Sequence, residues 1–493
     1  MTTLVALLDA ARPADPSTAL LDLPSGESLT YGEIDDWSAR LGAVLRDAGA
    51  AKGDRVLVQM EKSALAVALY LACVRSGMVL VPANPAYTDD ELAFLIGDAE
   101  PMVVVVDPRR IDGVRAPAVL TADDTGCGSL ADAAAAARPQ GSDAPVGDDD
   151  LAAVLYTSGT TGRPKGAMLT QAHLANNASA LIDGWGFGPD DVLLHALPLF
   201  HAHGLFVALN CALGSGSRLI MLARFDPDAV LDQLSRATVF MGVPTYYTRL
   251  LAHPRLDRHT CRRVRLFVSG SAPLAATTHA AFEERTGQRI LERYGMTETL
   301  MITSNPLDGE RRAGSVGRPL RGVTVAVVDR QRGTPLPPGE VGEIAVGTDP
   351  PFAGYWRRPG QAEVGADGLF MTGDLGRWDD DGYLSIVGRA RDLVISGGLN
   401  VYPGEVEAVL DDLEGVRESA VVGLPDPDLG EKVVAVVVAD PGCDLDPERL
   451  RADARRRLAP YKVPKAITVV DALPRNVMGK VEKALLRQRL AGG

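Results

Sequence analysis

Hydrophobic positions in the first 150 residues alternate between a helical and a strand-like spacing. Thr30 and Glu33 form a capping-box pattern that predicts an amphipathic helix to about Ala48, and residues 55–60 predict a strand. Further helices are expected over residues 63–76 and 89–95, and further strands over residues 78–81 and 102–106. Strands separated by helices are typical of βαβ units, so the pattern predicts a parallel sheet.

The pattern changes twice further along the chain. A second α/β stretch covers residues 170–302, and short β-rich runs between proline-rich turns then predict a small β-barrel or sandwich. The residues after Arg391 have helices and strands of their own. We therefore expect an α/β protein with a large N-terminal domain (1–390), built from two βαβ-type subdomains and a small β-barrel, and a small mobile α+β lid domain (391–493).

Composition excludes several classes of protein. Of the 493 residues, 46% are apolar and 23% charged, which is typical of a folded globular chain. A net charge of −14 disfavours nucleic acid and anionic membranes as partners. Five dispersed cysteines without a C-x-x-C pair, and an N-terminus unlike a signal peptide, lead us to expect a cytoplasmic protein without a membrane anchor. Composition does not indicate an oligomeric state.

A glycine-rich loop follows the apolar strand expected at residues 151–156. Its sequence is Thr157-Ser-Gly-Thr-Thr-Gly-Arg-Pro-Lys-Gly166. Glycines, hydroxyls and a lysine after a strand can surround phosphate oxygens, and a flexible linker is the alternative. The loop differs from a Walker A sequence, because Lys165 follows proline and precedes glycine. The candidate phosphate ligands are Thr157, Ser158, Gly159, Thr160, Thr161 and Lys165.

This loop resembles the signature of the adenylate-forming superfamily, which includes acyl-CoA and aryl-CoA synthetases, firefly-luciferase-like enzymes and peptide-synthetase adenylation domains. Seven further motifs occur in the family's order, and among family members the chain most resembles malonyl-CoA synthetases. The motifs are Leu197-Pro-Leu-Phe-His-Ala-His-Gly204, Ser269-Gly-Ser-Ala-Pro273, Tyr294-Gly-Met-Thr-Glu-Thr299, Thr372-Gly-Asp374, Gly388-Arg-Ala-Arg-Asp392, Ser396-Gly-Gly-Leu-Asn400 and Pro474-Arg-Asn-Val-Met-Gly-Lys480.

The resemblance implies ATP, magnesium and coenzyme A as cofactors. It assigns Asp374 and Arg389 to the ribose and Tyr294 to the adenine, although a turn carboxylate and a core tyrosine are the alternatives. Glu298 is the implied magnesium ligand, with a helix-capping acid as the alternative, and Thr297 the implied contact of the α-phosphate. The full implied nucleotide set adds Gly270, Ser271, Ala272, Pro273, Arg293 and Gly295.

The same resemblance implies a two-step reaction. Lys480 would join the carboxylate to the α-phosphate in the first step, whereas sequence alone makes it a solvated lysine. The Ser396, Gly397 and Gly398 loop would serve the thiol in the second step, after rotation about Arg391. His201 would gate access of the thiol, with a structural histidine as the alternative.

These parts predict an AMP-forming acid-thiol ligase that releases AMP and pyrophosphate. A short or aryl acid, or delivery to a carrier protein, is the alternative, although only thirteen residues follow Lys480. The chain has no Walker A, G-x-G-x-x-G or G-x-S-x-G motif, which disfavours kinases, dehydrogenases and hydrolases. A sensor that had lost catalysis would lack Lys480 or Glu298, and both are present.

Cations around the expected acyl pocket favour malonate or methylmalonate as the acid. Arg236, His203 and Arg293 would be buried without partners beside a long acyl chain, whereas a second carboxylate would pair with one of them. Met301 is flexible enough to close the pocket over a short acid. The alternative is that Arg236 pairs with Asp232 and Arg293 bonds to backbone.

Overall fold

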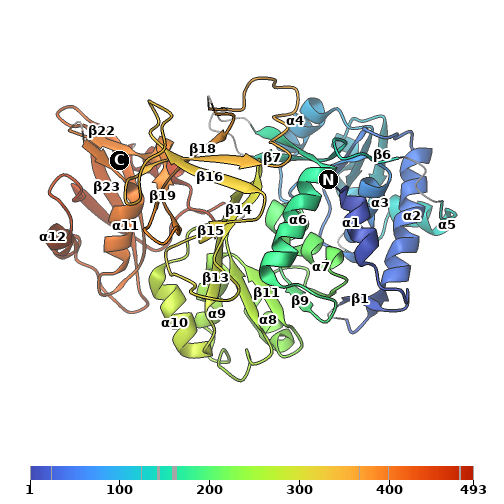
Figure 1. Cartoon of the computed structure of the whole chain (residues 1–493), viewed down its shortest axis with the longest axis horizontal. Coiled ribbons are helices and arrows are strands. Elements are labelled where there is room, and N and C mark those ends of the chain that lie inside the picture. The colour runs from blue at the N-terminus through green and yellow to red at the C-terminus, as the bar shows by residue number, and fades with distance from the viewer. Residues whose placement is uncertain are drawn as a thin grey trace.

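The structure is a computed structural model that describes residues 2–23, 25–123, 125–140, 145–157, 164–365, 367–397, 399–476 and 479–491. The N-terminal α/β part and the small C-terminal part lie at opposite ends of the molecule, with the remaining sheets between them (Figure 1). Among the described helices, none has the length and apolar character needed to span a membrane. Four separate sheets organise the chain.

The first sheet confirms the predicted βαβ units. Its order is β6-β5-β3-β4-β7-β8, parallel through β7, with β8 returning antiparallel. The strands are β3 (Arg55–Val58), β4 (Val79–Pro82), β5 (Val103–Val106), β6 (Ala118–Thr121), β7 (Leu151–Thr157) and β8 (Lys165–Thr170). The helices along this part are α2 (Tyr31–Asp47), α3 (Ala64–Arg75), α4 (Asp89–Ala99), the 3₁₀ helix η1 (Pro108–Gly113) and α5 (Ser129–Ala136). The predicted capping box at Thr30 and Glu33 is present at the start of α2.

The second sheet has nine strands in the order β15-β14-β13-β12-β11-β9-β10-β1-β2. Its central strands are parallel, as predicted, and they are β9 (Val192–His195), β10 (Arg218–Met221), β11 (Val239–Gly242), β12 (Leu266–Ser269) and β13 (Ile290–Met296). The sequence did not predict the remaining strands, β1 (Ala19–Asp22), β2 (Ser28–Thr30), β14 (Leu300–Ser304) and β15 (Arg318–Pro319). Accompanying helices are α1 (Leu4–Ala11), α6 (Gln171–Trp185), the π-helix η2 (His203–Leu209), α7 (Asn210–Gly214), α8 (Pro227–Leu234), α9 (Pro244–Leu251) and α10 (Ala276–Thr286).

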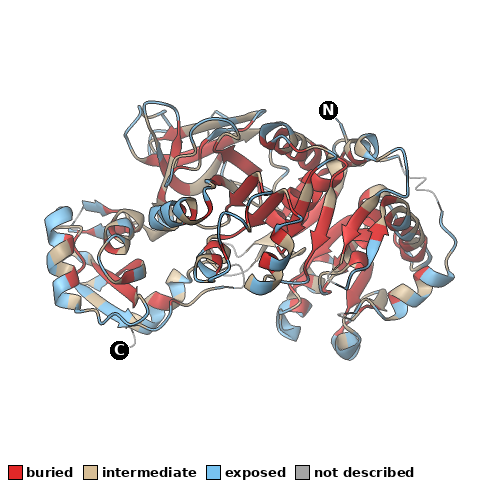
Figure 2. Cartoon of the chain, turned by 90° about the horizontal axis from the view of Figure 1, so that it is seen from below, coloured by how far each residue is buried: buried red, intermediate tan, exposed pale blue. Residues whose placement is uncertain are grey.

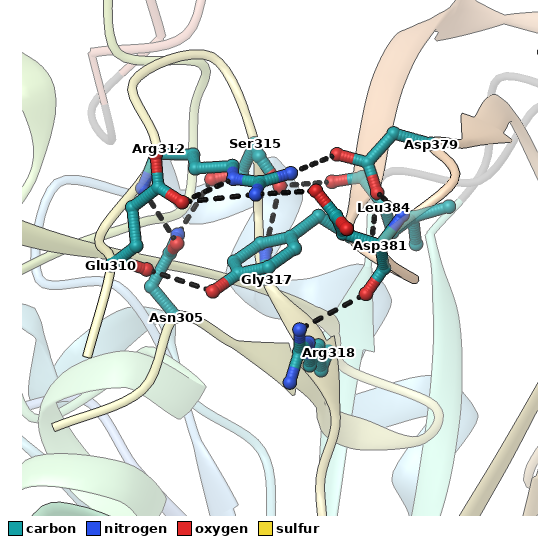
Figure 3. Close-up of polar contacts among 10 residues, drawn as sticks. Asn305, Glu310, Arg312, Ser315, Gly317, Arg318, Asp379, Asp381 and Leu384 are labelled. Carbon is teal, nitrogen blue, oxygen red and sulfur yellow. Dashed lines mark hydrogen bonds and ion pairs between the residues drawn. The ribbon is translucent and has the colours of Figure 1, made fainter. Parts of the chain in front are cut away.

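The predicted small barrel or sandwich takes the form of an open antiparallel sheet of four strands. The strands are β16 (Val323–Val328), β17 (Gly342–Thr348), β18 (Phe370–Trp378) and β19 (Leu384–Arg389). Polar contacts attach this sheet to the loop between β14 and β15 (Figure 3). Arg312 pairs with Asp379 at 2.6 Å and Asp381 at 2.7 Å, and its guanidinium lies over the Tyr383 ring. The anchor therefore fixes β18 and β19 against the second sheet.

The C-terminal part has a sheet in the order β21-β20-β23-β22, with β24 paired to β23. Its elements are the 3₁₀ helix η3 (Ala390–Asp392), β20 (Val394–Ser396), β21 (Leu399–Val401), α11 (Pro403–Asp411), β22 (Val416–Asp426), β23 (Gly430–Ala439), α12 (Pro447–Arg457), β24 (Ala466–Val470) and α13 (Lys483–Ala491). Two clusters of buried apolar side chains consist only of residues after 393. Figure 2 shows buried residues in this part as well as in the strands of the larger sheets. A core of its own supports the proposed lid boundary at residue 391.

Candidate active site

The second sheet brings most of the predicted site residues to one edge. His195, Gly242 and Ser269 end β9, β11 and β12, which are parallel neighbours. In open α/β sheets, ligands bind outside the carboxyl ends of the strands. The segments that follow these strands carry His201, His203 and the turn that begins at Gly270. The edge is therefore the candidate active site.

The predicted nucleotide residues Asp374, Arg389 and Tyr294 are in direct contact. The Tyr294 hydroxyl donates to Oδ2 of Asp374 at 2.6 Å, and Arg389 Nε lies 3.1 Å from Oδ1. Asp374 and Arg389 are register partners on β18 and β19, while Tyr294 comes from β13. The site therefore joins the second and third sheets, and the ribose and adenine roles stay predictions.

Residues on either side of the glycine-rich loop are paired on the β7–β8 hairpin. Thr157 is the register partner of Lys165, whose Nζ lies 5.2 Å from the centre of the Tyr355 ring. The predicted phosphate ligands Ser158, Gly159, Thr160 and Thr161 lie outside the described residues. The hairpin nevertheless aims Lys165 at an aromatic ring that also contacts Glu298.

Glu298 is a buried carboxylate suited to a hard cation. It is 7% exposed, burial raises its pKa, and Tyr355 donates its hydroxyl to Oε1 at 2.9 Å. Thr297 precedes it in the same turn and is partly buried. Within the described ranges, no three His, Cys, Asp or Glu side chains form a metal cage. The role of Glu298 as a magnesium ligand beside the phosphates stays a prediction.

The sequence did not single out Tyr355. Its segment is hydrogen-bonded along β8, where the Trp356 N–H donates to the Gly166 carbonyl at 2.7 Å and the Met168 N–H to the Gly354 carbonyl at 3.0 Å. These bonds hold the ring between Lys165 and Glu298. A single aromatic residue in a loop belongs to no periodic pattern. The contacts of Tyr355 with Lys165 and Glu298 are therefore visible only in the structure.

The turn after β12 is shaped by Gly270 and Ser271. A Cβ atom on Gly270 would lie 2.4 Å from Cζ of Arg293, so only glycine leaves room for this guanidinium. Ser271 has a φ of +72°, in the left-handed region that non-glycine residues rarely occupy. Its Oγ lies 3.3 Å from Nδ1 of His203. Ala272 and Pro273 continue this turn, whose backbone remains the predicted frame for the adenine edge.

Arg293 is a buried cation for which the described residues supply no anionic partner. It is 4% exposed, and burial lowers its pKa to about 9. Its Nε and Nη2 atoms have no hydrogen-bond partner in the described part of the chain, and neither does the nearby Nε2 of His203. The alternative was that Arg293 bonds to backbone, and among the described residues Nε and Nη2 make no such bond. An unpaired guanidinium edge marks a place for an anionic group.

Met301 and Gly295 are register partners on β14 and β13. The sulfur-bound methyl of Met301 lies 2.5 Å from the position a Cβ would take on Gly295, and Met301 is 3% exposed. Asn177 fixes the strand here, since its Nδ2 donates to the Met301 carbonyl at 2.9 Å. The two residues are neighbours, as a pocket wall requires, and contact with substrate stays a prediction.

The prediction that Arg236 lines the acyl pocket is wrong. Arg236 precedes β11 and so lies at the amino end of a strand whose carboxyl end faces the site. It is half exposed and pairs with Asp22 at 2.6 Å. The alternative partner, Asp232, pairs with Arg255 instead. The strand was predicted correctly, but a residue that precedes a parallel strand lies a strand length away from the carboxyl end that faces the site.

Lys480 reaches the site from the C-terminal part. Burial, followed by the charge of Arg389, lowers its pKa to about 8. Burial and the charge of Lys480 in turn lower the pKa of partly buried His201 to about 3. Next to it, a Cβ on Gly479 would lie 3.1 Å from Oγ1 of Thr245. The Lys480 loop therefore packs on the N-terminal part.

The hairpin predicted for the second step faces solvent in the same arrangement. Its side chains Ile395 and Leu399 are 52% and 49% exposed, while Ser396 is buried. Gly397 is exposed and Gly398 lies outside the described residues. Arg391 lies in η3, between β19 and β20, and its hinge role stays a prediction.

Comparison with known proteins finds one enzyme family along most of the chain. The family model of AMP-binding enzymes matches residues 9–356, and the family model of the AMP-binding enzyme C-terminal domain matches residues 405–480. A feruloyl-CoA synthase from Amycolatopsis is 39% identical over 94% of each chain. A malonate–CoA ligase from Arabidopsis thaliana is 33% identical over 94% of this chain and 85% of its own.

Among solved structures, MatB from Rhodopseudomonas palustris is similar in two states. The ATP-bound form is 49% identical over 99% of each chain, with a TM-score of 0.96. The apo form is 50% identical over 99% of this chain and 98% of its own, with a TM-score of 0.86. The present arrangement therefore resembles the ATP-bound form more, in agreement with Lys480 at the site.

Proposed function

The chain belongs to the AMP-binding enzyme family as an ATP-dependent acyl-CoA ligase, and we propose that its acid is malonate or methylmalonate. In the reaction, a substrate carboxylate attacks the α-phosphorus of ATP and pyrophosphate leaves. The thiolate of coenzyme A then attacks the acyl carbonyl and AMP leaves. The second carboxylate of the acid takes no part in either bond change, so it serves only recognition.

The proposed choice of acid rests on the guanidinium group of Arg293. Its guanidinium edge is buried near His203 at the carboxyl edge of the second sheet, and no residue that the structure describes pairs with it. A buried charge whose partner is missing destabilises the folded state by about 3 to 5 kcal/mol. A second carboxylate would pair with two parallel N–H groups and remove most of this cost.

The relatives support a dicarboxylate without deciding it. A malonate–CoA ligase and MatB are similar over nearly the whole chain, and so is a feruloyl-CoA synthase. A feruloyl group has no second carboxylate, so it would leave Arg293 unpaired. The charge of the pocket therefore favours malonate over an aryl acid.

The described residues divide the first step among them. Lys480 would place its charge between the substrate carboxylate and the α-phosphate, where negative charge spreads in the transition state. Glu298 would hold magnesium, which supplies charge neutralisation at the phosphate oxygens when bound. Asp374 and Arg389 would hold the ribose, and His201 would cover the acyl group until the thiol enters.

A panel of carboxylic acids tests this proposal, scored by CoA-dependent AMP formation with the wild-type enzyme. We expect the highest kcat/KM with malonate or methylmalonate, and weak turnover with butyrate, benzoate and ferulate. A preference for butyrate, benzoate, ferulate or a long-chain acid would overturn the choice of acid and leave the ligase assignment in place. AMP formation that needs no CoA for turnover would instead point to a carrier protein as acceptor.

A further inference from the structure

Lys62 is a second, partly buried cation, and it contacts the end of the strand that precedes the site histidines. Lys62 follows β3, and its Nζ lies 2.6 Å from Nδ1 of His195 and 2.7 Å from the carbonyl oxygen of His195. Burial lowers its pKa well below the ordinary value for lysine. Over the described ranges, no carboxylate forms an ion pair with it. Such an ammonium is costly to the fold, which suggests a functional reason for it.

The contacts with Gly204 and Lys62 fix the proton position on His195. The carbonyl oxygen of Gly204 can only accept, so in the neutral ring Nε2 carries the hydrogen and Nδ1 accepts from Nζ of Lys62. Nε2 then donates to the carbonyl oxygen of Gly204 at 2.9 Å. His195 is 2% exposed, and burial together with Lys62 lowers its pKa to about 3, so the ring stays neutral.

Gly204 is the end of the loop that carries both site histidines. A Cβ on Gly204 would lie 2.0 Å from the Pro198 carbonyl oxygen, so the loop closes on itself here. Within it, the His203 N–H donates to Nδ1 of His201 at 3.2 Å. Fixing the Gly204 peptide therefore orients His201, the predicted gate, and His203, which contacts Ser271.

His203 is coupled electrostatically to Arg293 and to His195, the partner of Lys62. Its pKa is lowered by burial and then by the electrostatic effects of Arg293, His201 and His195. Lys62 is hydrogen-bonded to His195. Lys62 comes from the segment between β3 and α3, whereas Arg293 comes from β13. Within the described residues, neither cation forms an ion pair with a carboxylate.

We propose that Lys62 is a positioning residue for the acyl pocket, which acts through His195 and selects an acid with a second carboxylate. This inference rests on the proposed function and deepens it. The Lys62–His195 pair holds the 198–204 loop in the arrangement that completes the pocket. Its positive charge also favours a dianionic acid over a monoanionic acid of the same shape.

The test compares malonate with malonamate, which has the same shape but one charge fewer. Lys62→Met removes the ammonium at similar length, and His195→Gln keeps a donor for Gly204 but loses the acceptor for Lys62. Lys52→Met is the matched control, because Lys52 pairs with Asp150 at the surface of the first sheet. Each variant is assayed for kcat and KM with both acids, for ATP affinity and for thermal stability.

We expect Lys62→Met to lower the malonate-to-malonamate ratio of kcat/KM about tenfold or more, mainly through KM. His195→Gln should lower the same ratio. The ratio in the double variant should be no lower than that of the more impaired single variant, because the two residues act as one unit. ATP affinity and the Lys52→Met enzyme should be unchanged.

Equal losses with both acids, an unchanged ratio, or additive effects in the double variant would overturn the inference. If one variant fails to fold, the other still decides it, since both predict the same fall in the ratio. A wild-type enzyme without preference for malonate would instead contradict the proposed function.

Discussion

Lys480 is the residue whose removal should separate the two half-reactions. Lys480→Ala is expected to block adenylation far more than thioester formation from supplied acyl-adenylate. Loss of a positive charge at the transition state should cost roughly 3 kcal/mol or more, on the order of a hundredfold. Pyrophosphate release and thioester formation are measured separately, and equal loss in both would make Lys480 a structural residue.

The pKa of Lys480 predicts a pH dependence for adenylation. Its pKa of about 8 means that the required charge is present below this pH and is lost as the pH rises through it. The kcat/KM for adenylation, which reports the free enzyme, should therefore fall above about pH 8. Lys480→Arg should move this fall to higher pH at a lower overall rate. A wild-type profile that is flat to high pH would refute the prediction.

The site residues show which individual roles can be predicted from sequence and which cannot. Asp374, Arg389 and Tyr294 were predicted to act together from motif order, and the structure confirms their contact. Arg236 was assigned to the pocket from its neighbourhood in sequence, which does not distinguish the two ends of a strand. Lys62 and Tyr355 were missed because their importance comes from partners more than fifty positions away.

At the scale of elements, the turn after β12 makes a steric prediction. Gly270→Ala would bring a Cβ within 2.4 Å of Cζ of Arg293, so the guanidinium must move. Overpacking of this kind costs about 1 to 3 kcal/mol, and we expect kcat/KM for malonate to fall by about tenfold or more. Butyrate turnover should change little. Gly97→Ala, in α4 with open space around it, is the control.

A similar loss for malonate and butyrate would show that Gly270→Ala disturbs the whole turn rather than Arg293. Kinetics with both acids and thermal unfolding of both variants distinguish these outcomes. An Ala at Gly97 should leave both acids unaffected, since it adds a helix-favouring residue without a new contact.

Elements with local signals were the ones that sequence predicted well. The helix from Tyr31 was predicted from its capping box, and the parallel strands were predicted from apolar runs between helices. The β1–β2 hairpin joins the second sheet through β10, which lies almost two hundred residues later. Pairing over such a distance leaves no periodic pattern in the sequence. The ion pair between Arg312 and Asp379 in Figure 3 also joins distant segments, so it could not be predicted from sequence either.

For the whole molecule, the lid should change position between the two steps. Lys480 lies at the site while the 396–400 hairpin faces solvent, and an ion pair of 2.8 Å between Arg487 and Asp392 links α13 to η3. Hydrogen exchange around residues 389–397 should differ between apo enzyme and enzyme with a non-hydrolysable acyl-adenylate mimic. Identical exchange in all ligand states would count against a moving lid.

The central claim is that Arg293 selects a second carboxylate, and one specificity measurement tests it most directly. The kcat/KM values for malonate and malonamate are compared in wild-type enzyme and in Arg293→Met, with thermal stability recorded for both. The wild-type enzyme should prefer malonate strongly. Arg293→Met should lose this preference by about 2 to 5 kcal/mol while unfolding at the same or a higher temperature, because an unpaired buried charge has been removed. Equal use of the two acids by wild-type enzyme, or a preference that survives in Arg293→Met, would contradict the account.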